Sequence, residues 1–104
     1  NFSNEDSVLI IRVFLNKLKR ILILSNEYKK NNDLNLTISS AKPPIFWKQK
    51  EITKQQILKL SPEQIKEIIY KVNELEMEIK KNYENSVNLL TNFILNSFFN
   101  KTNN

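Results

Sequence analysis

Glycine is absent from all 104 residues of the chain, and so are cysteine and histidine. Without glycine, the chain has no phosphate-binding glycine-rich loop and few ways to make the tight hairpin turns that need positive φ angles. Without cysteine or histidine, it has no disulfide, thiol nucleophile, imidazole base or ordinary zinc site. We therefore expect an all-α protein with no catalytic residue, metal or cofactor, and this fragment is not expected to be an enzyme.

The chain is basic, with 16 Lys and Arg against 11 Asp and Glu, a net charge of +5. This charge suggests an anionic partner such as nucleic acid, or serves solubility alone. Abundant Asn, Lys and Ile look like the codon bias of an AT-rich genome, which weakens the charge argument. The absence of cysteine fits a reducing cytoplasm. Because the chain starts at Asn1 without a leader, we expect a fragment of a longer protein.

The first helix is predicted over residues 4–30. Ser3 and Asp6 form a capping box at its start. Apolar residues then recur at helical spacing, and we expect this helix to be mostly buried, with polar residues including Arg12 and Lys19 in a narrow stripe. It is not expected to cross a membrane, because its basic side chains would each cost several kcal/mol at that depth.

Two shorter helices are predicted over residues 34–40 and 44–58. The first helix should end where Asn31 or Asn32 adopts the left-handed conformation that usually calls for glycine. Asp33 can cap the next helix, which must stop before Pro43. Since proline is tolerated in a first helical turn, Pro43 and Pro44 are predicted to open the helix over 44–58.

The last two helices are predicted over residues 62–81 and 86–99. Ser61, Pro62 and Gln64 form the clearest helix start in the chain, with serine as the N-cap and proline in the first position. Asn100–Asn104 is expected to be a frayed tail. The pattern therefore predicts a compact bundle of about five helices that forms one domain over residues 1–104.

The order of these helices and the segment at the proline pair resemble the C-terminal collar domain of the bacterial DNA polymerase III delta subunit. A Pro-Pro-x-Phe sequence followed by basic residues opens the third collar helix in many members of that family. The matching residues here are Pro43, Pro44, Phe46, Lys48 and Lys50. Further similarity lies in Gln56, Leu58 and Ser61 and in the segment 76–80, Glu-Met-Glu-Ile-Lys.

The resemblance implies a bacterial, cytoplasmic part of the clamp loader, which loads the sliding clamp on primed DNA during replication. Delta collar domains pack with the tau/gamma and delta-prime subunits, and the sliding clamp would be reached only through domains absent from this chain. The parent subunit would belong to the DNA polymerase III holoenzyme, a DNA-directed DNA polymerase, without itself being catalytic. No phosphate loop is expected, because delta lacks a functional ATPase site.

Candidate site residues follow from both lines of reasoning. Phe46 or Trp47 could stack on a base while Lys48 and Lys50 neutralise phosphates, although one of the two aromatic rings could instead fill the core. The resemblance places the start of this helix, and Tyr83, on the side that faces primer–template DNA. Arg12 and Lys19 are either a solvated face or contacts to another subunit, and Glu76 either lies at that interface or pairs with Lys80.

Two other functions stay open. A stand-alone basic helical module would bind duplex DNA by itself with a steep dependence on salt. An enzyme would need residues that lie outside this fragment.

Overall fold

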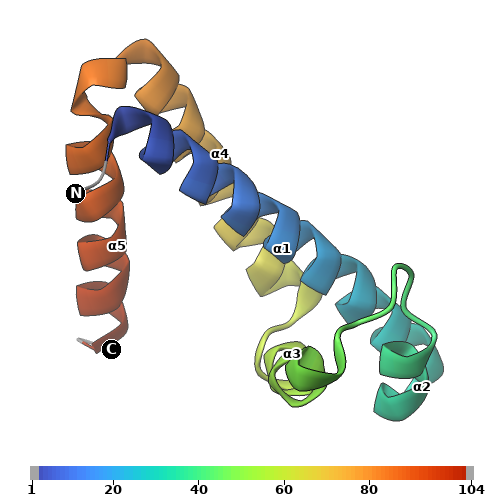
Figure 1. Cartoon of the computed structure of the whole chain (residues 1–104). Coiled ribbons are helices and arrows are strands. Elements are labelled where there is room, and N and C mark those ends of the chain that lie inside the picture. The colour runs from blue at the N-terminus through green and yellow to red at the C-terminus, as the bar shows by residue number, and fades with distance from the viewer. Residues whose placement is uncertain (1–2, 103–104) are drawn as a thin grey trace. The chain divides into compact units, whose positions relative to one another are not determined.

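The computed structural model describes the backbone of residues 3–102 and the side chains of residues 3–97. Five α-helices and two short 3-10 helices follow one another, and no strand occurs in the described part of the chain (Figure 1). The prediction of an all-α protein is confirmed. The elements are α1 (Asn4–Asn31), α2 (Leu34–Ser39), η1 (Trp47–Gln49), α3 (Lys50–Lys59), α4 (Pro62–Lys81), η2 (Tyr83–Asn85) and α5 (Ser86–Thr102).

The helices group into two compact units, which are described separately. The first unit comprises Asn1–Leu15 and Tyr70–Asn104, and the second comprises Asn16–Ile69. The boundaries between the units fall within α1 and α4, so each of these two helices contributes residues to both units. That residues 1–104 form one domain stays a prediction.

The predicted caps are present at three helix starts. At α1, the hydroxyl of Ser3 accepts from the N–H of Asp6 at 3.1 Å, and the Asp6 carboxylate accepts from the N–H of Ser3 at 3.0 Å. Ser61 and Gln64 exchange the equivalent bonds at 2.9 and 3.1 Å before α4. The carboxylate of Asp33 caps α2 at 3.0 Å. These bonds satisfy N–H groups that the first helical turn leaves without partners, so the helices begin where the polar side chains are.

The end of α1 uses asparagine in place of glycine. Asn32 has a φ of 54°, as predicted, and its N–H donates to the carbonyl of Tyr28. The side-chain oxygen of Asn31 then accepts from the N–H of Asp33 at 2.8 Å and from the buried hydroxyl of Thr37 at 3.2 Å. These contacts fix the turn between α1 and α2 without a glycine.

The second unit has its core where α1, α2 and α3 meet. Leu24, Ile38, Ala41 and Ile57 are buried together, and Tyr28, Leu34 and Ile45 pack against them. Since Ala41 and Ile45 come from the segment between α2 and η1, this segment is attached to the core at two points.

The prediction that Pro43 and Pro44 open a helix over 44–58 is wrong. Residues 42–46 are not helical, a 3-10 turn follows, and α3 begins only at Lys50. A proline pushes its predecessor toward extended conformations, so Pro43 cannot be helical before Pro44. Phe46 is also extended, with a ψ of 133°. The segment stays extended because this conformation brings Ile45 onto the core.

The first unit has its buried apolar residues on α1, α4 and α5. They are Ile11, Leu15, Val72, Leu75, Ile79 and Leu90. The prediction that the first helix is mostly buried is wrong, because Leu9, Ile10, Val13 and Phe14 are exposed. The described part of this unit covers only the stripe of α1 that carries Ile11 and Leu15.

The last helix is longer than predicted. It continues to Thr102, so the expected frayed tail from Asn100 is helical as far as the structure describes it, and residues 103–104 lie outside the described part. On this helix Leu90 is buried and Ile94 is exposed, whereas the side chain of Phe98 is not among those described. Among the described residues, no helix combines the length and the apolar character needed to cross a bilayer.

Candidate functional site

The candidate site lies at the segment 42–50 of the second unit, which Ile45 attaches to the core. A second attachment comes from Arg20 on α1, whose guanidinium donates a hydrogen bond to the carbonyl oxygen of Pro43. The peptide bond between Lys42 and Pro43 is cis. With Ile45 packed inward and Pro43 held by Arg20, the residues that follow are presented at the surface.

Phe46 and Trp47 are both exposed, at 59% and 69% of their full surface. The alternative in which one of them fills the core is therefore wrong for this chain. Their ring centroids lie 5.9 Å apart and the ring planes are inclined by 49°. Rings at this inclination cannot hold one base between them as parallel plates. Each ring instead offers its own apolar surface for stacking.

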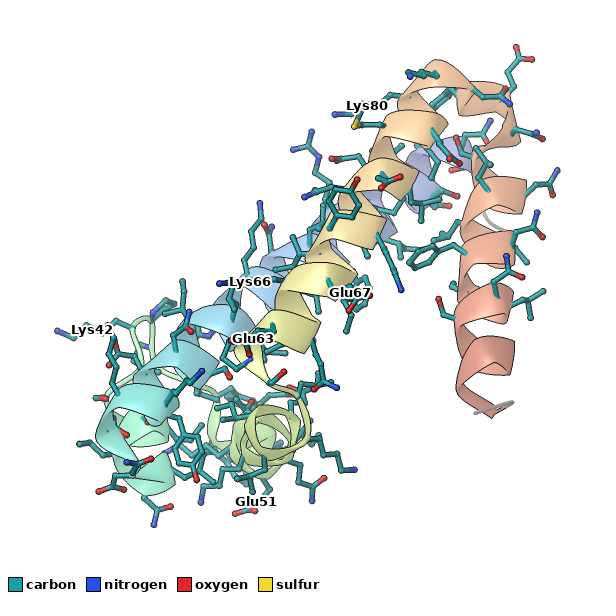
Figure 2. All side chains as sticks on the ribbon, turned by 180° about the vertical axis from the view of Figure 1, so that it is seen from behind. Lys42, Glu51, Glu63, Lys66, Glu67 and Lys80 are labelled. Carbon is teal, nitrogen blue, oxygen red and sulfur yellow. The ribbon has the colours of Figure 1, made fainter. Side chains whose placement is uncertain are left out.

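The segment that carries the two rings also carries lysine side chains. The ammonium of Lys48 lies 5.3 Å from the centroid of the Trp47 ring, a cation–π contact worth about 0.5–1 kcal/mol at an exposed site. Lys50 is exposed at the start of α3, and Lys42 extends outward from the loop (Figure 2). Lys54 differs, since Glu51 lies 3.5 Å away and offsets its charge. The site therefore combines two accessible aromatic rings with three lysines, a composition suited to the bases and phosphates of a nucleic acid.

Phe46 occupies an unusual position for an aromatic residue. It is the N-cap of η1, and no side-chain hydrogen bond caps this start. Serine, threonine, aspartate or asparagine is preferred at N-caps because their oxygens accept from the free N–H groups. The chain therefore carries an exposed ring where a small polar residue would add stability, and such local departures concentrate at functional sites.

Tyr83, the remaining predicted DNA-facing residue, belongs to the first unit. It begins η2, is 43% exposed, and its carbonyl accepts a hydrogen bond from the buried hydroxyl of Ser86. This contact fixes the backbone of the turn between α4 and α5 and leaves the phenol ring accessible. Among the described residues, no lysine lies over the Tyr83 ring as Lys48 lies over that of Trp47.

The residues predicted at a subunit interface have different surroundings. Arg12 on α1 lies 3.6 Å from the carboxylate of Glu76 on α4, and Lys80 lies 4.0 Å from the same carboxylate. The predicted pair of Glu76 with Lys80 is confirmed, and Glu76 also joins two helices of the first unit. Lys19 is exposed on the part of α1 that belongs to the second unit.

Sequence reasoning missed the exposed apolar surface on the first half of α1. Leu9 and Val13 are one turn apart, as are Ile10 and Phe14, so the four side chains form two neighbouring rows. We call this set the α1 apolar surface. A signal was present in the sequence: the apolar positions of α1 extend over more of the helix than a single stripe requires.

The start of α4 carries the clearest electrostatic effect of the second unit. The pKa of Glu63 is lowered, first by hydrogen bonding at its own backbone and then by the Lys29 ammonium, which lies 3.6 Å from the carboxylate. Both contributions favour the charged carboxylate at a helix N-terminus, where negative charge is also favoured by the helix dipole. This ion pair links the end of α1 to the start of α4 within the second unit.

The described residues contain no group of three His, Cys, Asp or Glu side chains arranged to hold a metal ion. No family model, curated protein or solved structure matches the chain.

Proposed function

We propose that this chain is the collar segment of a bacterial DNA polymerase III delta subunit and serves to assemble the clamp loader. The observation that carries the proposal is the α1 apolar surface, Leu9, Ile10, Val13 and Phe14. Contiguous exposed apolar side chains are characteristic of a surface that another protein covers. The resemblance of the segment 43–50 to the delta family names the partners, which are the tau/gamma and delta-prime subunits.

A secondary role in contacting primer–template DNA is supported by Phe46, Trp47 and Lys48. These residues are exposed, adjacent and combined with a cation, and no packing role in the second unit requires the two rings at the surface. Tyr83 is proposed to take part from the first unit. The sliding clamp would be contacted only through other domains of the parent protein, and the protein would act in the bacterial cytoplasm.

Assembly is tested by co-purifying the full-length parent protein with the tau/gamma and delta-prime subunits encoded in the same genome, at near-physiological salt. We expect a complex with the wild type and its loss when Leu9→Glu and Val13→Glu are combined, because two charges would be buried in an apolar contact. Leu36→Glu is the matched control, since Leu36 is exposed on α2 outside the α1 apolar surface. Failure of the wild-type protein to associate would overturn the proposal.

The second candidate is an autonomous DNA-binding module, favoured by the net charge of +5. Against it, several of the described basic side chains lie within 4.0 Å of carboxylates, among them Arg12, Lys29, Lys54 and Lys80. Cations with such partners neutralise fewer phosphates. Binding of duplex DNA by the 104-residue chain alone, with a steep loss of affinity as salt rises, would favour this candidate over the collar segment.

A further inference from the structure

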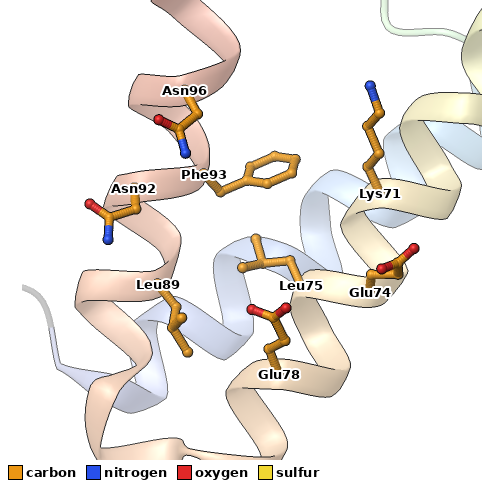
Figure 3. Close-up of a pocket in the computed structure, with 8 residues that line it drawn as sticks. All are labelled: Lys71, Glu74, Leu75, Glu78, Leu89, Asn92, Phe93 and Asn96. Carbon is orange, nitrogen blue, oxygen red and sulfur yellow. The ribbon is translucent and has the colours of Figure 1, made fainter.

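A groove of about 300 Å³ runs between α4 and α5 in the first unit (Figure 3). Leu75, Leu89 and Phe93 give it an apolar floor, and Figure 3 shows Phe93 and Leu75 pointing toward one another from the two helices. Leu75 is buried, whereas Leu89 and Phe93 are half-buried. A side chain placed in the groove would therefore cover apolar surface that the described part of the first unit leaves partly accessible.

The two rims of the groove differ in charge. On α4 the rim carries Glu74 and Glu78, with Lys71 one turn before Glu74. On α5 it carries the uncharged amides Asn92 and Asn96. The carboxylates outnumber the one ammonium, in a chain whose net charge is +5. A phosphate backbone would be repelled from the α4 rim, and a basic protein segment would be attracted to it.

The positions of the rim residues suggest the shape of the occupant. Glu74 and Glu78 are four residues apart on one helix, so they are separated by about 6 Å along its axis. The same spacing relates Asn92 to Asn96 on α5. On each rim a polar side chain recurs after one helical turn. This spacing matches that of a third helix lying along the two rims, with its apolar residues on the groove floor.

Tyr70 lies one turn before Glu74 on α4. Hydrogen bonding to Glu74 and the negative charge of this carboxylate raise the pKa of Tyr70. Both partners are exposed, so Glu74 keeps oxygen lone pairs available for a further donor.

We propose that the α4–α5 groove binds an amphipathic helix of a neighbouring clamp-loader subunit, which places two Lys or Arg side chains one turn apart against Glu74 and Glu78. This contact rests on the proposed function and adds a second binding surface to the α1 apolar surface. The charge difference between the rims fixes how the helix is rotated about its axis, with its basic side toward α4 and an uncharged polar side toward α5.

The charge of the α4 rim is tested by combining Glu74→Lys and Glu78→Lys in the full-length parent protein. We expect its affinity for the tau/gamma and delta-prime subunits to fall at least about tenfold, because like charges would face one another. The matched control combines Glu27→Lys and Glu84→Lys, which makes the same change in net charge at exposed positions outside the groove. An unchanged affinity of the groove variant in a complex that the wild type forms would overturn this inference and leave the proposed function standing.

The identity of the occupant is tested by placing a photo-crosslinking amino acid at Asn92, on the α5 rim, in the assembled complex. We expect a crosslink to a helix of another subunit that carries Lys or Arg at positions three or four apart. A crosslink to DNA, a crosslink to a second copy of this chain, or no crosslink would each overturn the inference. If the wild-type parent forms no complex with the other subunits, the proposed function is overturned. That outcome is seen with the wild type alone, without the groove variants.

Discussion

Prolines lie at the start of α4 and shortly before α3, yet the two helix starts are built in different ways. Before α4, Ser61 and Gln64 exchange two hydrogen bonds, and Pro62 is buried in the first helical position. Before α3, the prolines at 43 and 44 lie in an extended segment, a 3-10 turn comes first, and Phe46 caps it without a side-chain hydrogen bond. A proline thus accompanies a helix start, and the reciprocal polar cap determines where the helix begins.

The side chains at the two helix starts also have different surroundings. At the start of α4, the polar side chains are engaged with the backbone and contribute to folding. Before α3, the N-cap position of η1 presents the aromatic ring of Phe46 to solvent beside Trp47 and Lys48. Residues that break a local rule of stability are retained where binding requires them. The contrast supports the proposal that the segment before α3 serves binding, whereas the polar cap before α4 serves folding.

The strongest test of this contrast is Trp47→Ala in the full-length parent protein. Loss of an aromatic stacking surface typically costs about 1–3 kcal/mol per base, so we expect primer–template DNA to bind at least about fivefold more weakly. Fluorescence anisotropy at one fixed salt concentration measures the affinity. Leu58→Ala is the control, because Leu58 is also an exposed apolar residue of the second unit. Equal losses in both variants would contradict a specific role for the indole ring.

The next largest effect is expected from Ser61→Ala, measured by thermal and denaturant unfolding of the 104-residue chain. Removal of an N-cap hydroxyl costs about 1 kcal/mol, which lowers the Tm of a domain of this size by about 4–8 °C. Ser39→Ala serves as the control, since the hydroxyl of Ser39 bonds only to a carbonyl within α2. A Tm unchanged by Ser61→Ala would mean that the proline alone fixes the start of α4.

Phe46→Ser is expected to raise the free energy of unfolding, which is opposite to the effect of Ser61→Ala. It supplies the missing cap at η1, so we expect a gain of about 0.5–1 kcal/mol in the free energy of unfolding, together with weaker DNA binding. Unfolding and anisotropy measurements on the same variant test both effects. A loss of stability would show that the phenyl ring contributes to packing, and the proposal that the segment before α3 serves binding would be wrong.

The smallest effect concerns the charge at the start of α4. Lys29→Gln removes the ammonium that helps to lower the pKa of Glu63, so we expect that pKa to rise toward its ordinary value. A pKa lowered in the folded state stabilises the fold above the unfolded pKa, and this contribution is lost as the pH falls through the folded value. Carboxyl chemical shifts followed through an NMR titration measure the change. The backbone contribution should remain, so a pKa fully restored to normal would contradict it.

The sequence was sufficient for those helices whose ends are set by local chemistry. The caps at Ser3, Asp33 and Ser61 and the left-handed turn at Asn32 depend on neighbours within a few residues, so they could be predicted from spacing alone. The start of α3 could not, because it depends on the packing of Ile45 against residues distant in the sequence. Local propensity favoured a helix over this segment, but the packing of Ile45 against the core keeps the chain extended.

The candidate site was predictable in part for the same reason. The adjacency of Phe46, Trp47 and Lys48 is visible in the sequence. The exposure of both rings is not, because Phe and Trp side chains are more commonly buried. The α1 apolar surface escaped prediction because a wide apolar stripe is equally typical of a helix buried within its own domain. Only the arrangement of the first unit showed that Leu9, Val13 and their neighbours are left uncovered.

The α1 apolar surface has a consequence for the life of the protein in the cell. A copy that has found no partner displays Leu9, Ile10, Val13 and Phe14 to every chaperone and protease it meets. Unpartnered copies would then be removed faster than assembled ones, and the steady-state amount of the chain would follow the amount of its partners. In this way, an exposed row of apolar side chains would set the stoichiometry of an assembly without any dedicated regulator.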